Sequence, residues 1–266
     1  MKKYLIVFLC TFMLMISGCS KEEEKISEMS GKQMLIVGMD CDNQPFAYEV
    51  KEQSQDSVVL GEGYVKGFDV SLSRYLAKTL QREISIVNME PSQMSEALEE
   101  GSIDVAISAL TMKDDDQVDV SSPYYEEGYS MIVRKDSKLA SAKSIQTFAK
   151  KKVIALKDSL ATEAIKEIKD VTVLEALDKE ALVKALLEKQ CDGIIVANSI
   201  AKVIVKTNKD TTMVSFDKEQ GFTTKNQYVI VLKEGIKEEE ESLYHEIEAA
   251  LQSLETETKN DWMKAN

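Results

Sequence analysis

The chain has 266 residues, of which 44% are hydrophobic and 30% charged, and its formal net charge is −13. This length allows one large domain or two smaller ones with cores of their own. The acidic balance argues against nucleic acid as a partner, because nucleic-acid binding relies on basic surfaces. The chain has one histidine, His245, which we place on the polar side of the last predicted helix. With one histidine and no paired thiols, we expect no metal site, no histidine-based catalytic triad and no cofactor.

The N-terminus predicts an export signal followed by a lipid attachment site. Two lysines precede an apolar run at residues 4–16, which is too short to span a membrane, and small residues then lead to Cys19. The stretch 16–19, Ile-Ser-Gly-Cys, resembles the lipobox of bacterial lipoproteins. This resemblance implies a signal peptide at 1–18, a lipid on Cys19 and a polar tether at 19–32 that holds the protein to a membrane surface. An ordinary hydrophobic anchor is the alternative.

Two cysteines remain in the part of the chain that follows the tether, Cys41 and Cys191. An exported protein can form disulfides, but the elements described below place these two residues in different lobes. We therefore expect two free thiols.

From residue 33 on, short apolar runs rich in β-branched residues alternate with amphipathic stretches. In the first half we expect a strand at 34–39, a surface hairpin within 49–63, a helix with Leu72, Leu76 and Leu80 on one face, a strand at 84–89, a helix capped by Ser92 that extends through Glu100, and a strand at 103–107. This strand–helix alternation favours a parallel, doubly wound sheet with right-handed crossovers.

Ligands of such sheets bind beyond the carboxyl ends of the strands. The segment Asp40–Phe46 follows the first strand and carries polar groups and one aromatic residue, so we expect it at the binding edge. Ser108–Thr111 follows the third strand and is a candidate ligand wall. Thr111 fits the N-cap of a further helix, and the acidic residues 114–116 fit its first turn, where they complement the helix dipole. A calcium loop does not fit, because no glycine turn and no closing glutamate follow at the required offsets.

The second half of the chain repeats the alternation. We expect a strand at 129–134, a short helix at 144–149, a strand at 152–156, a helix at 159–168, a strand at 171–175, a helix at 179–187 and a strand at 193–197, followed by a strand at 228–232 and a terminal helix at 238–254. The sequence therefore predicts a second lobe of similar construction.

Two stretches resemble a known family. Ser108–Tyr125 contains Leu-Thr and then Val-Asp-x-Ser-x-Pro-Tyr-Tyr, and Gly67–Val70 reads Gly-Phe-Asp-Val. Both are similar to motifs of the bacterial extracellular solute-binding proteins of family 3, the amino-acid-type receptors of ABC importers. The resemblance implies an α/β, two-lobed periplasmic-binding-protein-like fold of type II, in which each lobe is a doubly wound sheet and two crossings form a hinge. It also implies a receptor that closes on a small solute and works with an ABC permease.

The resemblance implies specific boundaries and a location. The first lobe would comprise 33–124 plus 229–266, the second lobe 129–223, and the hinge 125–128 and 224–228. We expect an extracytoplasmic monomer, anchored to the cell membrane by its lipid.

The family pattern also implies a set of ligand-binding positions. In this sequence they are Asp40, Asn43, Phe46, Pro91, Ser108, Ala109, Leu110, Thr111, Asp116, Lys157, Ala161, Ala197 and Asn198. Several depart from the family. Asp116 stands where amino-acid-binding members have the arginine that clamps the ligand carboxylate, and Ala197, or Asn198 one residue on, stands where they have the aspartate that binds the ammonium group. Asn43 and Pro91 replace aromatic residues, whereas Lys157 matches a basic residue found in some members.

These departures predict a changed specificity. An aspartate in place of arginine would leave a ligand carboxylate facing like charge, which is among the costliest arrangements in a buried site. The sequence predicts an acidic pocket that prefers cationic or carboxylate-free solutes such as amines, unless Lys113 reaches in to replace the missing cation. Two other functions stay open, a non-transport sensing module on the same fold and an enzyme that uses a cleft carboxylate such as Asp40, Glu90 or Asp116.

Overall fold

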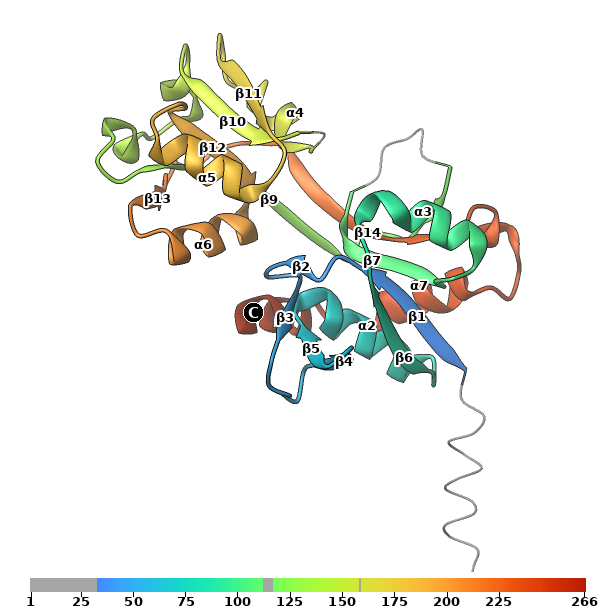
Figure 1. Cartoon of the computed structure of the whole chain (residues 1–266). Coiled ribbons are helices and arrows are strands. Elements are labelled where there is room, and N and C mark those ends of the chain that lie inside the picture. Colours follow the sequence, from blue (N-terminus) through green and yellow to red (C-terminus); the bar gives the residue numbers. More distant parts are fainter. Residues whose placement is uncertain (1–32, 112–116, 158) are drawn as a thin grey trace, which may run out of the picture. The chain divides into compact units, whose positions relative to one another are not determined.

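The computed structural model describes residues 33–111, 117–157 and 159–266 (Figure 1). Residues 1–33 and 34–266 form separate units, and all the described helices and strands lie in the second. Its described strands form one sheet of ten strands and one of four. No described helix is both long enough and apolar enough to cross a membrane.

The first group of elements surrounds strand β1. Its strands and helices are β1 (Met34–Met39), α2 (Phe68–Thr79), β6 (Glu83–Asn88), α3 (Pro91–Glu100) and β7 (Val105–Leu110). Strand β1 pairs in parallel with β6 on one side and with β7 on the other. Among the strands of the large sheet, the first, β1, thus lies between the next two, β6 and β7, as in a doubly wound sheet, and the expected parallel arrangement is confirmed.

The second group repeats this arrangement around strand β10. Its elements are β10 (Lys152–Leu156), α4 (Ala161–Ile165), β11 (Thr172–Ala176), α5 (Lys179–Leu187) and β12 (Gly193–Ala197), with β10 paired in parallel to both β11 and β12. The two groups also share a detail at the amino ends of their strands. Asp104 Oδ2 accepts a hydrogen bond from Ile36 N at 2.7 Å, and Asp192 Oδ2 accepts one from Lys152 N at 2.9 Å.

Two long strands connect the two groups. In the large sheet, β9 (Tyr125–Arg134) pairs with β12, and β14 (Lys225–Leu232) pairs with β7. Between these pairings, residues 125–128 and 225–228 pair with each other in antiparallel fashion. Eight of the ten strands therefore follow the order β11-β10-β12-β9-β14-β7-β1-β6, and the two crossing strands make this sheet continuous (Figure 1). The other two are short: β13 pairs with β9, and β8 pairs with β14.

The remaining elements are short strands and helices at the margins. They are β2 (Asp42–Asn43), β3 (Ala47–Val50), β4 (Val58–Leu60) and β5 (Gly63–Lys66) of the small antiparallel sheet, then β8 (Asp119–Val120), the 3-10 helices η1 (Lys138–Ser141), η2 (Ile145–Phe148) and η3 (Ile236–Glu238), and α6 (Asn198–Thr207), β13 (Thr211–Met213), α7 (Leu243–Ser253) and α8 (Thr256–Ala265).

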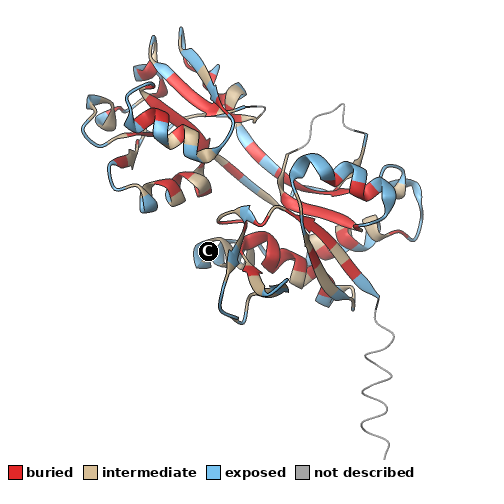
Figure 2. Cartoon of the chain, in the orientation of Figure 1, coloured by how far each residue is buried: buried red, intermediate tan, exposed pale blue. Residues whose placement is uncertain are grey.

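Buried residues lie along the sheet strands and on the helix faces that cover them (Figure 2). In the first group, Leu72 and Leu76 of α2 are fully buried, as their helical spacing predicted. An aromatic cluster extends this core to the crossing strands, since Phe46, Phe68 and Tyr228 pack together with Tyr124. The second group has its own buried clusters, which draw on residues 129–214.

The beginning of helix α3 differs from the expectation. Ser92 was expected as its cap, but the helix begins at Pro91 and Glu90 precedes it as the cap. Glu90 and Gln93 form a capping box, in which the side chain of each residue accepts a hydrogen bond from the backbone N–H of the other. Proline suits the first helical position, because its missing N–H would have no partner there and its φ is already helical. The capping signal was therefore present in the sequence, two residues earlier than expected.

Several other bounds also differ. Strand β7 continues to Leu110, so the expected loop residues Ser108–Leu110 lie on a strand. The helix expected at 159–168 is only α4, five residues long. The terminal helix expected at 238–254 begins only at Leu243, as α7, and ends at Ser253, where Leu254 adopts an extended conformation. Helix α8, which follows, was not expected. Helix α6 was not expected at all, since its isoleucines and valines are typical of strands.

Candidate functional site

The carboxyl ends of the parallel strands form two edges at which ligands bind in folds of this type. In the first group, Asp40 follows β1 and Thr111 follows β7. In the second, Lys157 follows β10 and Asn198 follows β12. These four sequence-predicted residues therefore lie at the strand ends next to the points where the strand order reverses.

At the first edge, Asp40 is tied to the neighbouring strand. Its backbone N donates to Ser108 Oγ at 3.0 Å, and its Oδ1 accepts from Asp42 N at 2.9 Å. Cys41 N donates to Asn88 Oδ1 at 3.1 Å. The loop after β1 is thus fixed to β7 and to β6, and the Ser108 hydroxyl braces that loop.

A buried carboxyl group lies directly behind the predicted ligand wall. Asp69, in the first turn of α2, accepts hydrogen bonds from Ala109 N at 2.7 Å and from Tyr124 Oη at 2.8 Å. Burial raises the pKa of Asp69 to about 7, although both hydrogen bonds oppose the rise. Burial, together with the nearby Asp69 carboxyl group, also raises the pKa of Tyr124. Asp69 belongs to the Gly-Phe-Asp-Val motif, but nothing in the sequence around it indicates a role at the site.

The other first-edge candidates take different positions. Phe46 is 1% exposed and packs on Tyr228 with a ring-centroid distance of 5.0 Å, so it is a core residue. Pro91 is exposed at the start of α3. Asn43 Oδ1 accepts a hydrogen bond from Lys179 Nζ at 3.1 Å, and the Asp42 carbonyl accepts another at 3.2 Å. Lys179 begins α5, and the sequence analysis did not identify it as a site residue.

At the second edge the predicted residues are mostly uncharged. Ala161 and Ala197 are buried in the core, and Asn198 Oδ1 accepts a hydrogen bond from Ser130 Oγ at 2.7 Å. Lys157 is exposed, and its backbone N donates to the Ala176 carbonyl at 2.8 Å. No carboxylate stands at 197 or 198 to bind an ammonium group.

Several predictions of the sequence analysis lie outside the described residues. They are the signal peptide at 1–18, the tether at 19–32 with Cys19, and the helix expected to begin at Thr111, with Lys113 and the acidic residues 114–116.

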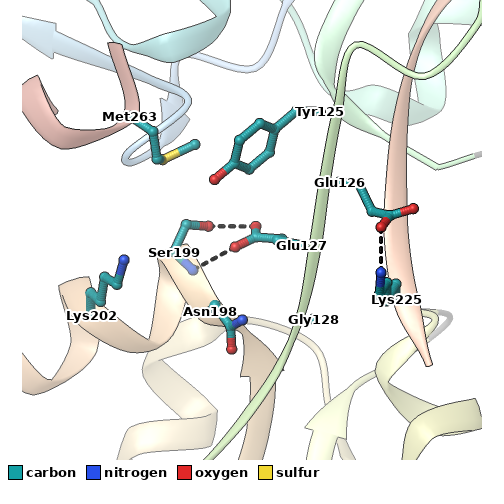
Figure 3. Close-up of a pocket in the computed structure, with 9 residues that line it drawn as sticks. All are labelled: Tyr125, Glu126, Glu127, Gly128, Asn198, Ser199, Lys202, Lys225 and Met263. Carbon is teal, nitrogen blue, oxygen red and sulfur yellow. Dashed lines mark hydrogen bonds and ion pairs between the residues drawn. The ribbon is translucent and has the colours of Figure 1, made fainter. Parts of the chain in front are cut away.

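A cavity of about 310 Å³ opens beside the two crossing strands (Figure 3). It is lined by Tyr125, Glu126, Glu127, Gly128, Asn198, Ser199, Lys202, Lys225 and Met263. Among the predicted ligand-binding residues, Asn198 contributes to this lining, and the predicted hinge contributes Tyr125–Gly128 and Lys225.

Glu126 and Glu127 point to opposite sides of strand β9 (Figure 3). Glu127 is 8% exposed, and its carboxylate accepts hydrogen bonds from Ser199 N and Ser199 Oγ, both at 2.7 Å, and from Tyr228 Oη at 2.9 Å. Glu126 is exposed and forms an ion pair with Lys225 at 2.6 Å. Glu127 thereby joins the first turn of α6 to both crossing strands. The acidic pair directly after Pro-Tyr-Tyr was the signal in the sequence that could have drawn attention to it.

Within the described ranges, no group of three or more histidine, cysteine, aspartate or glutamate side chains is arranged to hold a metal ion. The candidate site consists of hydrogen-bond donors and acceptors at the carboxyl ends of the parallel strands. Such an arrangement suits the recognition of a small polar molecule.

Comparison with known proteins agrees with this arrangement. Residues 35–265 match the bacterial extracellular solute-binding proteins, family 3. The chain belongs to this family. Its members are extracellular receptors by that description, so the protein works outside the cytoplasm. The match also confirms the resemblance noted in the motifs at 67–70 and 108–125.

Among its relatives are two binding proteins of Bacillus subtilis. The arginine-binding extracellular protein ArtP is 29% identical over an alignment that covers 79% of this chain and 78% of that protein. The ABC transporter glutamine-binding protein GlnH is 25% identical over 98% of this chain and 95% of that protein. A solved structure of the amino acid ABC transporter substrate-binding protein AbpA from Streptococcus pneumoniae, bound to L-arginine, superposes with a TM-score of 0.67 at 26% identity and covers 91% of this chain and 96% of that one. These are type II periplasmic binding proteins, and the chain has their two-lobed fold.

Proposed function

We propose that this protein is the lipid-anchored substrate-binding component of an ABC importer and binds a small cationic solute, an amino acid or an amine, between its lobes. The observation that carries the proposal is the family match over 35–265, together with relatives named for binding arginine and glutamine. A permease is the implied partner. The protein would act as a monomer, with the lipid on Cys19.

We further propose the division into lobes that the sequence indicated. The first lobe would comprise 33–124 and 229–266, the second 129–223, and the hinge 125–128 and 224–228. The antiparallel pairing of these two crossings supports the division, because a short paired ribbon can bend while the sheets on either side stay intact.

The preference for a cationic solute rests on the charges at the strand ends. Asp40 and Asp42 follow β1, and Glu90 follows β6, so the first edge is acidic. The second edge has Ala197 and Asn198 at the position where amino-acid-binding members of the family have an aspartate, so it adds no carboxylate, and the preference rests on the first edge. An acidic edge attracts a cation and opposes a free α-carboxylate. Asp116 would add to this charge.

A thermal melting screen of the mature protein tests the proposal. We would compare L-arginine, L-glutamine, putrescine and agmatine, the amine that arginine becomes when it loses its α-carboxyl group. A solute at a hundred times its dissociation constant should stabilise the fold by about 2.7 kcal/mol, which is a measurable shift in Tm. A Tm that L-glutamine alone raises, or that none of the four solutes moves, would count against this solute class.

A further inference from the structure

Three segments that border the proposed cleft are all bonded to one residue, Asp69. Its carboxylate accepts from Ala109 N in the predicted ligand wall and from Tyr124 Oη, directly before the first crossing strand. Its backbone N donates to the Phe46 carbonyl at 2.9 Å, at the end of the loop that follows β1. We propose that Asp69 is a positioning residue for ligand binding, which holds the wall at 108–111 in its binding conformation.

The wall needs such a restraint. Ala109 has a φ of 47°, in the left-handed region that a residue with a Cβ occupies only at an energetic cost. Its N–H is aimed at Asp69 Oδ2 at 2.7 Å and lies 3.2 Å from Tyr124 Oη. A hydrogen bond from this N–H to the buried side-chain oxygen offsets that cost, so Asp69 can hold Ala109 where an unrestrained chain would relax to negative φ.

The position of Asp69 is itself fixed by the loop on the other side. Phe68 N donates to the Pro45 carbonyl at 3.1 Å, next to the bond from Asp69 N to Phe46. Gly67 permits this approach, because a Cβ at that position would lie 2.1 Å from the Phe46 carbonyl oxygen. The first turn of α2 is therefore locked against the loop, and the carboxylate has little freedom to follow the wall if the wall moves.

Asp69 also reaches the crossing strands through Tyr124. Tyr124 N donates to the Tyr228 carbonyl at 2.9 Å, which pairs the two crossings just where β9 begins. The Asp69 carboxylate thus fixes the position of the wall at 108–111 relative to the start of strand β9. Because Asp69 is fully buried, it acts through Ala109 and Tyr124 and does not touch the solute.

The consequence for affinity follows from the fraction of molecules with the wall in place. If that fraction falls to about a tenth, the apparent dissociation constant rises about tenfold. This inference rests on the proposed function, since it assumes that the wall contacts the solute. The position of the wall, however, can be measured without any solute.

The test compares three variants of the mature protein. Asp69→Ala removes both acceptors. Asp69→Asn keeps an oxygen for Ala109 N and offers an N–H to Tyr124 Oη, so it should rescue. Asp104→Ala is the matched control, because it removes a carboxylate that accepts a 2.7 Å bond from a backbone N–H at the opposite end of the same strands. Amide exchange at 108–111 is measured without solute, and calorimetry uses agmatine and L-arginine.

We expect Asp69→Ala to speed exchange at 108–111 at least tenfold and to weaken binding about tenfold or more. Asp69→Asn should stay within about threefold of the parent in both. Asp104→Ala should lower Tm without changing either. Equal exchange at 108–111 in Asp69→Ala and Asp104→Ala would overturn the inference, as would failure of Asp69→Asn to rescue.

Two other results, an unfolded Asp69→Ala variant and a parent protein that binds neither probe, still leave the role of Asp69 testable. If Asp69→Ala does not fold, Tyr124→Phe replaces it; this variant keeps the Asp69–Ala109 bond and should show smaller changes in the same direction, whereas no change would contradict the proposal. If the parent binds neither probe, the proposed solute class fails and the exchange measurement alone decides the role of Asp69.

Discussion

At the scale of single residues, Asp69 carries a carboxyl group in surroundings that oppose its charge. Burial raises its pKa from 3.8 to about 7. The folded protein therefore binds more protons than the unfolded chain between about pH 4 and pH 7, so the free energy of unfolding should fall as the pH rises through this window. The groups that face the carboxyl are the Tyr124 hydroxyl, which stays neutral because its own pKa is raised, and the Ala109 amide.

The pH dependence can be measured by urea unfolding at pH 5 and pH 7.5. Relative to Asp69→Asn, the native protein should lose on the order of 2 kcal/mol between the two values. Asp104→Asn, which retains Asp69, should show the native dependence. A native protein whose difference from Asp69→Asn is the same at both pH values would show that Asp69 does not titrate in this window.

The two thiols give a second prediction at this scale. Cys41 and Cys191 are both free and buried, which confirms the expectation of no disulfide. Burial raises the pKa of Cys41 to about 12 and that of Cys191 to about 11, and thiolates are the reactive form. A thiol reagent at pH 8 should therefore leave both residues unmodified in the folded protein and modify both after unfolding without reductant. A rapidly reacting thiol in the folded protein would contradict the burial of these residues.

At the scale of elements, the sequence predicted those whose signal is local. The bounds of β1, β10, β12 and α5 match the expectation, because each is a short apolar run or a clear amphipathic stretch ended by polar residues. Helix α6 was not predicted, because its residues have a high strand propensity. The packing of Ala201 and Ile204 against the sheet outweighs that propensity.

The candidate site was predictable only in part, for the same reason. Asp40 and Asn198 could be placed because each directly follows a recognisable strand. The bonds of Asp69 to Ala109 and of Lys179 to Asn43 join segments 40 and 136 residues apart in the chain. No local pattern reports such contacts, so the residues that brace the site had to come from the structure.

Glu127 provides the prediction at this scale. Its carboxylate joins the first turn of α6 to the crossing strands, so Glu127→Gln replaces an acceptor with a donor in a buried network. We expect a loss of about 1–3 kcal/mol in the free energy of unfolding. The adjacent Glu126→Gln is the matched control, because its exposed ion pair with Lys225 should contribute less than about 1 kcal/mol. Equal losses in the two variants would show that the network around Glu127 has no special weight.

At the scale of the whole molecule, the proposed lipid on Cys19 would decide where the protein is held. Cys19→Ala should release the protein to the medium or leave it unprocessed, because the acyl chains that bind the membrane cannot be attached. Fractionation of cells into membrane and medium, with the N-terminus determined by mass spectrometry, measures this. A variant that is processed and still membrane-bound would contradict lipid anchoring.

The central claim is that this member of the family binds a cationic solute in a pocket that no longer suits an α-carboxylate. Calorimetry of agmatine against L-arginine tests it most directly, on the native protein and on Asp116→Arg, Asp116→Asn and Lys113→Ala. We expect the native protein to bind agmatine more tightly than L-arginine. We expect Asp116→Arg to shift the preference towards L-arginine, because a guanidinium fork matches a carboxylate. Micromolar binding of L-arginine that Lys113→Ala abolishes and Asp116→Asn leaves unchanged would contradict it.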